Sequence, residues 1–392
     1  MPDFLHGIET LEISDGIRSI STVKSAVIGL VGTAPEADED KFPLNEPVLL
    51  TGPKLAAELG ATGTLGWAID GIYDQIGAAI VVVRVEEGVD DAATLTNVGG
   101  AAADQTGVHA LMTAESELGA SPRLLIAPGW THQRPDDDPN PVMVELKALA
   151  GKLRAIAIVD GPNTDDATAI AAAADAGSDR VYLVEWAKVW DAATSAYIAE
   201  PASGRTAGVI ARTDIESGFW YSPSNHPMQG VAGPARPLAF AYSDPNSQVN
   251  LLNEANVACV VRADGFRLWG NRTTGGDSQW AFLSVRRTAD LVYDSVERSH
   301  LWAIDKPFSS QLFRDIRDGV QAYLRQLKGL GAIAGGRCWL DEELNTPASL
   351  AAGQLWVDFD LEPVGPLERL TFRAHRNGGY YEELLQDAIQ AA

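Results

Sequence analysis

The chain has 392 residues, 46% of them hydrophobic, and carries a formal net charge of −23. This length suggests two or three domains, each able to bury an ordinary core. The negative charge argues against nucleic acid as a partner, because binding to phosphates needs a basic surface. No run of residues approaches the roughly 20 apolar residues of a membrane span, and MPDFLHGIET lacks the features of a secretory signal. We therefore expect no direct membrane insertion.

Residues 1–22 are expected to form an N-terminal arm. Ile8, Leu11 and Ile13 are separated by polar residues, partly with the period of two that is typical of a strand. A single short strand cannot bury itself. The arm must therefore pair with a sheet, either in its own chain or in a neighbouring molecule.

From residue 23 to residue 260 the pattern alternates between strands and helices. Continuous apolar runs such as SAVIGLVGTA (25–34) and AAIVVVRVEEG (78–88) are typical of strands buried on both faces. Such alternation predicts a Rossmann-like, mostly parallel α/β fold with helices on the faces of the sheet. The predicted parts are a first α/β segment at 23–100, an outer α/β domain at 101–216 and a return segment at 217–260.

The remaining residues predict a smaller α+β domain at 261–367 and a C-terminal arm and tail at 368–392. Two strands are expected at LWVDFDLEP and LERLTFRAHR, and in the second Leu370, Phe372 and Ala374 alternate with polar residues. FLSVRRT (282–288) is interpreted as an apolar strand followed by Arg286 and Arg287. One of these arginines could then point into an interface while the other faces away.

A search for chemistry predicts no catalytic residue, metal ligand or cofactor site. The sequence has no phosphate loop, dinucleotide fingerprint or nucleophile elbow, and its six histidines are scattered. Asp136, Asp137 and Asp138 could bind a hard cation, although a proline-flanked surface loop is the simpler interpretation. Cys259 and Cys338 lie among apolar residues and are expected to be buried free thiols.

Two other functions stay open as alternatives. One is an enzyme on a Rossmann-like scaffold, for which Asp160-Gly161-Pro162, after a predicted strand, is the one tempting site, although a turn there is the simpler interpretation. The other is a soluble oligomeric adaptor. The charge is unevenly spread, because residues 298–340 hold seven basic and three acidic residues in a very acidic chain, and such asymmetry is typical of two surfaces with different neighbours.

A long amphipathic helix is predicted at 309–328, inside this basic segment. Its apolar face is formed by Phe313, Ile316, Val320, Tyr323, Leu324 and Leu327. Beside that face lies a basic stripe with only Asp318 near it, made of Arg314, Arg317, Arg325 and Lys328. An ordinary solvated face would also fit, but four cations with one nearby acid favour an acidic partner surface.

Over nearly its whole length the sequence resembles the contractile tail sheath proteins of myophages and R-type bacteriocins. The stretch from Leu252 to Thr288 carries the most specific part of the resemblance. The matching segments are AVIGLVGTAP (26–35), GFWYSPSN (218–225), LNEANVACVVRADGFRLWGNRTT (252–274), FLSVRRT (282–288) and the long helix ending in GLGAIAGG.

The resemblance implies a helical homopolymer around an inner tail tube, with baseplate and tail-terminator proteins as further partners. It implies exchange of terminal strands between subunits, through Ile8, Leu11 and Ile13 of one arm and Leu370, Phe372 and Ala374 of the other. The basic stripe would face an acidic tube protein. Assembly would take place in the host bacterial cytoplasm, and contraction from a metastable extended state would need no nucleotide. The particle would be a phage tail or a bacteriocin.

Overall fold

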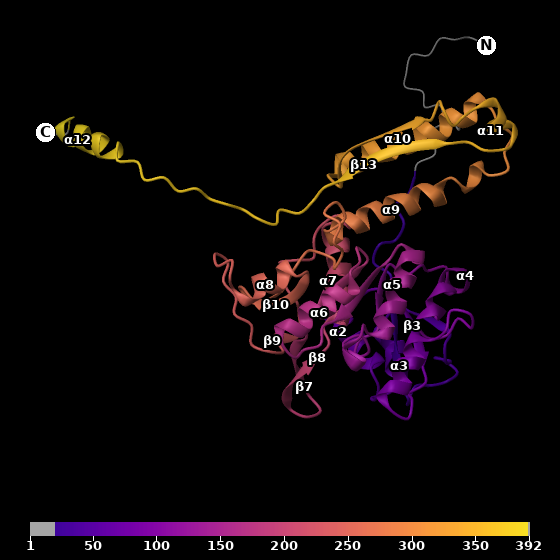
Figure 1. Cartoon of the computed structure of the whole chain (residues 1–392), viewed down its shortest axis with the longest axis horizontal. Helices are drawn as coiled ribbons and strands as arrows, with labels where there is room; N and C mark the ends of the chain where they lie inside the picture. The colour runs from indigo at the N-terminus through magenta and orange to yellow at the C-terminus, as the bar shows by residue number, and fades with distance from the viewer. Residues whose placement is uncertain (1–19, 391–392) are drawn as a thin grey trace, which may run out of the picture.

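The computed structural model describes residues 20–390 and places them in a large α/β domain, a small α+β domain and an extended C-terminal segment (Figure 1). The large domain is built on one eight-stranded sheet with the order β11-β10-β6-β5-β4-β1-β3-β2. Its six central strands are parallel, and β2 and β11 are antiparallel edge strands. The strands are β1 (Ile28–Thr33), β2 (Pro47–Leu50), β3 (Ile80–Val85), β4 (Leu124–Ile126), β5 (Ile156–Asp160), β6 (Val181–Val184), β10 (Val257–Arg262) and β11 (Phe266–Trp269).

Helices cover both faces of this sheet, as the alternating pattern predicts. One core cluster joins the sheet to α3 (Asp91–Gly99), α5 (Pro141–Leu153), α6 (Asp166–Ala176) and α8 (Gln248–Glu254). The opposite cluster joins it to α2 (Leu65–Tyr73) and α7 (Ser203–Glu216). Every residue of β1 and β3 is buried, which explains their unbroken apolar runs. The mixed α/β fold class is therefore confirmed.

Short elements complete the large domain. Side-chain caps begin three of its helices, where Asp90, Asn140 and Asp165 accept hydrogen bonds from the main chain of the first turn. A separate three-stranded sheet has the order β8-β7-β9. The remaining elements are α1 (Pro53–Ala56), α4 (Ala114–Leu118), β7 (Ala187–Asp191), β8 (Ala196–Glu200) and β9 (Val231–Pro234), with 3-10 turns at η1 (Ala57–Leu59), η2 (Gly107–Met112) and η3 (Pro135–Asp137).

The small domain packs two helices against a two-stranded antiparallel sheet. Its elements are α9 (Leu283–Ser299), η4 (Leu301–Ala303), α10 (Ser310–Leu330), β12 (Ile333–Leu340), α11 (Pro347–Ala351) and β13 (Val357–Pro363). Its core brings together side chains from α9, α10 and β12, and Ile20, at the start of the described chain, is buried in the same core. The root of the N-terminal arm therefore belongs to the small domain.

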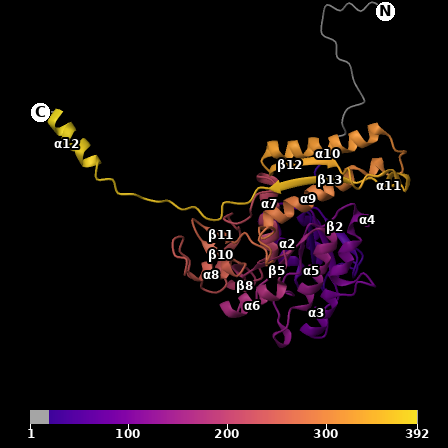
Figure 2. The same cartoon turned by 45° about the horizontal axis from the view of Figure 1, so that its top comes forward.

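The C-terminal segment extends away from both domains (Figures 1 and 2). Residues 364–377 have no regular secondary structure, and α12 (Tyr380–Gln390) lies well away from the two domains in both views (Figures 1 and 2). Every residue of α12 is exposed. Among residues 20–390, no helix is long and apolar enough to cross a membrane.

Two sequence-based expectations about local structure were wrong. FLSVRRT was expected to be a strand, but Leu283 begins α9, so Arg286 and Arg287 lie on successive positions of a helix. The expected strand at 368–376 does not form, because within residues 20–390 no strand pairs with this segment. In addition, β10 and β11 complete the large sheet, so this sheet extends past the predicted boundary at residue 260.

Candidate assembly surfaces

The basic stripe lies on the exposed side of α10. The helix begins at Ser309, whose side chain accepts a hydrogen bond from Leu312 N, and ends at Gly331 in the left-handed conformation. Its buried side carries Leu312, Val320, Tyr323, Leu324 and Leu327, which fix the helix against the small-domain core. The predicted apolar face is confirmed at four of its six positions, and Phe313 and Ile316 are half-buried.

The four predicted cations differ in their surroundings. Arg314, Arg325 and Lys328 are exposed, and none of them forms an ion pair with any residue between 20 and 390. Arg317 is half-buried and pairs with Asp318 at 2.7 Å. The stripe therefore offers three uncompensated positive charges to a partner, while Arg317 is partly neutralised within the helix.

The arm segments carry apolar side chains that nothing in the described chain covers. Leu370 is 63% exposed and Phe372 is 85% exposed, and Ala374 is exposed as well. Apolar side chains that alternate along one exposed segment make it a candidate for a surface that binds a partner. The corresponding N-terminal positions Ile8, Leu11 and Ile13 lie outside the described residues.

Both arms are fixed firmly where they leave the molecule. At the N-terminal root, Thr22 Oγ1 and Tyr323 Oη are 2.9 Å apart, and Val23 N donates to Ser295 Oγ at 3.0 Å. At the C-terminal root, Arg272 forms a two-pronged ion pair with Glu368, at 2.7 and 2.6 Å. The Arg272 guanidinium also lies 4.8 Å from the centre of the Phe282 ring. The described chain is therefore anchored to the small domain at Thr22 and Val23, and the C-terminal segment is anchored at Glu368.

A network of ion pairs joins α9 of the small domain to the large domain. Arg287 on α9 binds both carboxylate oxygens of Asp214 on α7, at 2.8 and 2.5 Å, and both side chains are buried. Further pairs join Arg180 to Asp290 at 2.5 Å and Arg154 to Glu297 at 2.6 Å. The Arg154–Glu297 hydrogen bond raises the pKa of Arg154 and lowers the pKa of Glu297.

Five further ion pairs of this network also involve α9. The remaining contacts are Arg154 with Asp294, Arg123 with Asp294, Arg286 with Asp290 and Asp179, and Arg298 with Glu115. Arg286 and Arg287 are thus both used inside the molecule, not one inside and one outside as predicted. Sequence reasoning missed the network because its acidic and basic members are far apart along the chain.

The carboxyl edge of the large sheet is where an enzyme of this architecture would hold its substrate. Asp160, the last residue of β5, is fully buried there and accepts hydrogen bonds from Ser203 N at 2.8 Å and Ser203 Oγ at 2.7 Å. These bonds place its carboxylate at the N-terminus of α7, which has no side-chain cap of its own. Burial raises the pKa of Asp160 to about 7, against the hydrogen bonds, which lower it.

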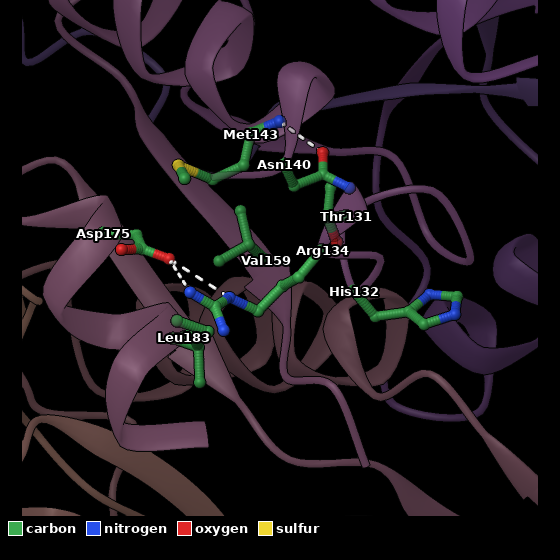
Figure 3. A pocket seen from close by; sticks show the side chains of 9 residues that line it. Thr131, His132, Arg134, Asn140, Met143, Val159, Asp175 and Leu183 are labelled. Carbon is green, nitrogen blue, oxygen red and sulfur yellow. Dashed lines mark hydrogen bonds and ion pairs between the residues drawn. The ribbon is translucent and has the colours of Figure 1, made fainter. Parts of the chain in front are cut away.

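A cavity beside this edge is too small for a substrate. It has a volume of about 10 Å³ and is lined by residues that include His132, Arg134 and Asp175 (Figure 3). Arg134 reaches Asp175 at 2.6 Å, and Thr131 and Val159 line the same space (Figure 3). A single water molecule needs roughly 10–15 Å³. Within residues 20–390, no three His, Cys, Asp or Glu side chains gather closely enough to hold a metal ion.

The surroundings of Cys259, Cys338 and the acidic loop Asp136–Asp138 are consistent with structural roles. Cys259 and Cys338 are free and buried, as predicted. Burial raises the pKa of both thiols, that of Cys338 to about 11, so they remain protonated. Asp136–Asp138 lie in a short turn after Arg134. None of these residues forms a site.

Comparison with known proteins decides the family. Sequence models of the phage tail sheath match three stretches: the central domain over 103–274, the C-terminal domain over 276–376, and the tail sheath protein Gp18 domain III N-terminal region over 25–85. The tail sheath protein of Escherichia phage P2 is 38% identical over 397 aligned positions, covering 98% of this chain and 98% of the phage protein. The chain belongs to the phage tail sheath protein family. It is a subunit of a contractile tail sheath.

Further relatives agree with this assignment. A prophage major tail sheath protein of Pseudomonas aeruginosa (strain UCBPP-PA14) is 39% identical to the sheath subunit, over 98% of this chain and 100% of the relative. The helical sheath of the anti-feeding prophage in its contracted state has the same fold. Its TM-score is 0.70 at 19% identity, and 95% of this chain and 99% of that chain are covered. The PVC sheath complex in its contracted state matches with a TM-score of 0.68 at 18% identity, over 97% and 100% of the two chains.

Proposed function

We propose that the sheath subunit polymerises helically around an inner tail tube in a metastable extended state, and that contraction drives the tube through a target cell envelope. The main support is the exposed C-terminal arm, whose apolar side chains Leu370 and Phe372 are not covered by any residue between 20 and 390. The two-stranded sheet β12–β13 offers strand edges to which an arm of another subunit can add.

Strand addition would link each subunit to its neighbours. Each added backbone hydrogen bond contributes about 0.5–1.5 kcal/mol net. Because the arm is covalently attached to a folded body, its strand acts at a high effective concentration. A head-to-tail contact that does not close on itself builds an open helix. Exchange through Ile8, Leu11 and Ile13 at one end and Leu370, Phe372 and Ala374 at the other therefore suits a helical homopolymer.

The two domains take different positions in this proposal. The small domain, with the basic stripe on α10, faces an acidic tube protein, and the large domain forms the outer part of the sheath. Baseplate and tail-terminator proteins bind at the ends of the polymer. The polymer assembles in the host bacterial cytoplasm, as part of a phage tail or a bacteriocin particle.

The surroundings of Asp160 support the proposal that contraction needs no nucleotide hydrolysis. The carboxylate of Asp160 already accepts hydrogen bonds from Ser203 N and Ser203 Oγ. The neighbouring cavity of about 10 Å³ has no room for a nucleotide. The free energy of contraction must then reside in the contacts between subunits. The contracted polymer should accordingly bury more surface than the extended one.

Calorimetry on extended particles tests this storage of free energy. We expect one irreversible exothermic transition in the absence of ATP, leaving contracted particles that withstand heat or denaturant better than the extended ones. Particles contracted before the scan are the control and should lack the exothermic step. A requirement for ATP, or spontaneous return from the contracted to the extended form, would refute this mechanism.

Charge reversal tests the orientation of the basic stripe. Replacing Arg314, Arg325 and Lys328 with Glu should reduce the number of sheaths that enclose tubes more than it reduces contacts between sheath subunits. The reversed stripe would repel an acidic tube within a Debye length of about 8 Å at physiological salt. Electron microscopy of sheaths formed with and without tubes measures both effects.

Arg317→Glu serves as the matched control for that experiment. Arg317 already pairs with Asp318, so reversing it removes less free positive charge from the stripe. Normal enclosure of tubes by the triple variant would mean that the stripe faces something other than the tube.

A further inference from the structure

The C-terminal helix α12 has an apolar face that no residue between 20 and 390 covers. The helix has 11 residues, and an isolated helix of this length is marginal in water. Its apolar residues recur at helical spacing and so lie together on one side. They are Tyr380, Tyr381, Leu384, Leu385, Ala388 and Ile389. This face is therefore a candidate for docking on another surface.

The charge of α12 restricts what that surface can be. Glu382, Glu383 and Asp387 occupy the other side of the helix, which holds no cation, and Glu382 and Asp387 border the apolar face on its two sides. Such a helix is repelled by nucleic acid, by anionic lipids and by the acidic tube proposed above. The partner that fits is an apolar surface with a cation beside it.

The chain between α12 and the segment proposed to exchange is short. Only Asn377, Gly378 and Gly379 lie between residue 376 and the helix, which allows a span of at most about 14 Å. A strand at 368–376 is about 30 Å long, which is also the length of the 21-residue helix α10. Strand exchange would therefore deliver α12 to one end of a neighbouring subunit's small domain.

The two ends of the small domain differ in chemistry. The C-terminal segment leaves at the end where α10 finishes, because Val364 N donates to Ala332 O at 3.2 Å. At this end Leu330 is exposed, and it is the only large apolar side chain of α10 that is. The loop with η4, between α9 and α10, lies at the other end (Figures 1 and 2).

The loop with η4 carries the most exposed large apolar side chains of Leu283–Pro363, which are Leu301 at 73% and Ile304 at 66%. Ile304 N donates to Leu301 O at 3.3 Å, so the two residues are one turn apart on the same side of the chain. Phe308 is exposed as well, and its ring lies 5.4 Å from that of Phe313. Leu301, Ile304 and Phe308 together are called the η4 patch.

A cation lies within the η4 patch. Lys306 is exposed, and its ammonium group lies 4.5 Å from the centre of the Trp302 ring. Between residues 300 and 314 there are two cations, Lys306 and Arg314, and one acid, Asp305. The η4 patch thus combines exposed apolar side chains with a small excess of positive charge.

The other exposed surfaces of the small domain suit an acidic amphipathic helix less well. The outer face of the β12–β13 sheet carries Asp358, Asp360 and Glu362. The exposed side of α10 carries the cations of the basic stripe but only one large exposed apolar side chain, at its end. Most of the acidic excess of the chain lies in the first 250 residues, so the large domain repels α12.

We propose that α12 of a neighbouring subunit docks on the η4 patch, with its apolar face on Leu301 and Ile304 and an acidic border towards Lys306. This inference rests on the strand exchange proposed above and adds a second contact to each exchanged arm. Because the two contacts are joined by a few residues, the second one forms at a high effective concentration once the first exists.

Cysteine crosslinking in assembled sheaths of the full chain tests this docking. Ile304→Cys is combined with Leu385→Cys or Ala388→Cys, because the register of the helix is not fixed and a disulfide needs Cβ atoms within about 4.5 Å. Leu330→Cys, at the other end of the small domain, is the matched control for Ile304→Cys. Gln386→Cys is the control for α12, because it places the thiol on the polar side of the helix.

We expect covalent dimers and longer ladders on non-reducing gels from at least one combination of Ile304→Cys with an apolar-face cysteine. No ladders are expected with Leu330→Cys or with Gln386→Cys. The native thiols are buried, so unmodified sheaths give the background. Sheaths assembled from a mixture of subunits with Ile304→Cys alone and subunits with the α12 cysteine alone should also give dimers, since the contact joins two subunits.

The outcomes separate this inference from the proposed function. Ladders from Leu330→Cys would overturn the choice of surface. Crosslinks within monomers, without dimers from the mixture, would show that α12 docks on its own subunit and not on a neighbour. Sheaths that form without any crosslink would overturn the docking while strand exchange stands. A native chain that forms no sheaths under the electron microscope would overturn the proposed function as well.

Polymerisation measures the contribution of the contact. A chain that ends at Asn377 keeps the proposed strand and loses only α12, and it should need about tenfold more subunit to polymerise, equivalent to about 1.4 kcal/mol. Leu301→Ser with Ile304→Ser should have the same effect, because these side chains are exposed in the single subunit and their loss leaves the fold intact. Leu330→Ser is the control and should change the concentration less than about twofold.

Combining the shortened chain with Leu301→Ser and Ile304→Ser should raise the concentration by less than a further factor of about two, because both changes remove the same contact. Two independent effects would instead multiply to about a hundredfold. A hundredfold rise, while the circular dichroism spectrum stays native, would contradict docking of α12 on the η4 patch.

Discussion

Deletion of residues 1–19 is expected to leave a folded sheath subunit that no longer polymerises. Ile20 is buried in the small-domain core, and Thr22 and Val23 are hydrogen-bonded to Tyr323 and Ser295. These three contacts of the described chain therefore lie beyond the cut. The deletion removes Ile8, Leu11 and Ile13, and with them the strand that would be donated to a neighbour. Sedimentation velocity should show monomers where the intact chain forms polymers.

A deletion that extends to residue 22 provides the contrast. It also removes Ile20 from the core, and loss of a buried aliphatic side chain of this size costs about 2–5 kcal/mol. The longer deletion should therefore lower the denaturant midpoint, while the shorter one should not. Tubes that still form after the shorter deletion, or loss of its native circular dichroism spectrum, would disprove the role given to the arm.

The sequence predicted those parts of the fold that local patterns determine. Buried runs such as those in β1 and β3 stand out because both faces of a central parallel strand are covered. The amphipathic helix α10 was predicted almost to its ends, since its buried and exposed positions repeat with the period of a helix. Asp165 begins α6, because its side chain caps the first turn of that helix.

Two errors show where local patterns fail. FLSVRRT has the composition of a strand, but Arg286 pairs with Asp290 one helical turn further on, and Arg287 is held by an acid distant in sequence, Asp214 on α7. The segment 368–376 has the alternation of a strand, yet a strand exists only where a second strand supplies hydrogen bonds. We propose that its pattern describes a contact with another molecule.

Only some residues of the candidate surfaces were predicted from the sequence. The basic stripe was visible because its cations share one helical face, although the pairing of Arg317 with Asp318 was not foreseen. The acids of β13 were overlooked, even though VDFDLEP alternates acidic and apolar residues along one strand. The hydrogen bonds of Gln321 to Cys338 N and Gly336 O could not have been predicted, because they depend on how closely α10 lies to the edge of β12.

The largest loss of stability is expected from Arg287→Ala. Arg287 and Asp214 have side chains only 4% and 1% exposed, and Arg287 also donates to Ser25 O at 3.2 Å. The substitution leaves the Asp214 carboxylate buried without its partner, which costs about 3–5 kcal/mol. Because the pair joins α9 to α7, the loss falls on the junction between the two domains. Urea denaturation at subunit concentrations too low for polymerisation measures the change in the free energy of unfolding.

Arg298→Ala is the matched control, because it removes the same side chain from the same helix. Arg298 pairs with Glu115, but the two side chains are 45% and 49% exposed, so the loss should be about 0–1 kcal/mol. Replacing both members of the buried pair, with Arg287→Met and Asp214→Leu, should recover most of the stability lost in Arg287→Ala, because no unpaired charge then remains buried. Equal losses from Arg287→Ala and Arg298→Ala would mean that the buried pair does not hold the domains together. Contraction would then have to transmit force from the large to the small domain through the other ion pairs of α9 and its packing.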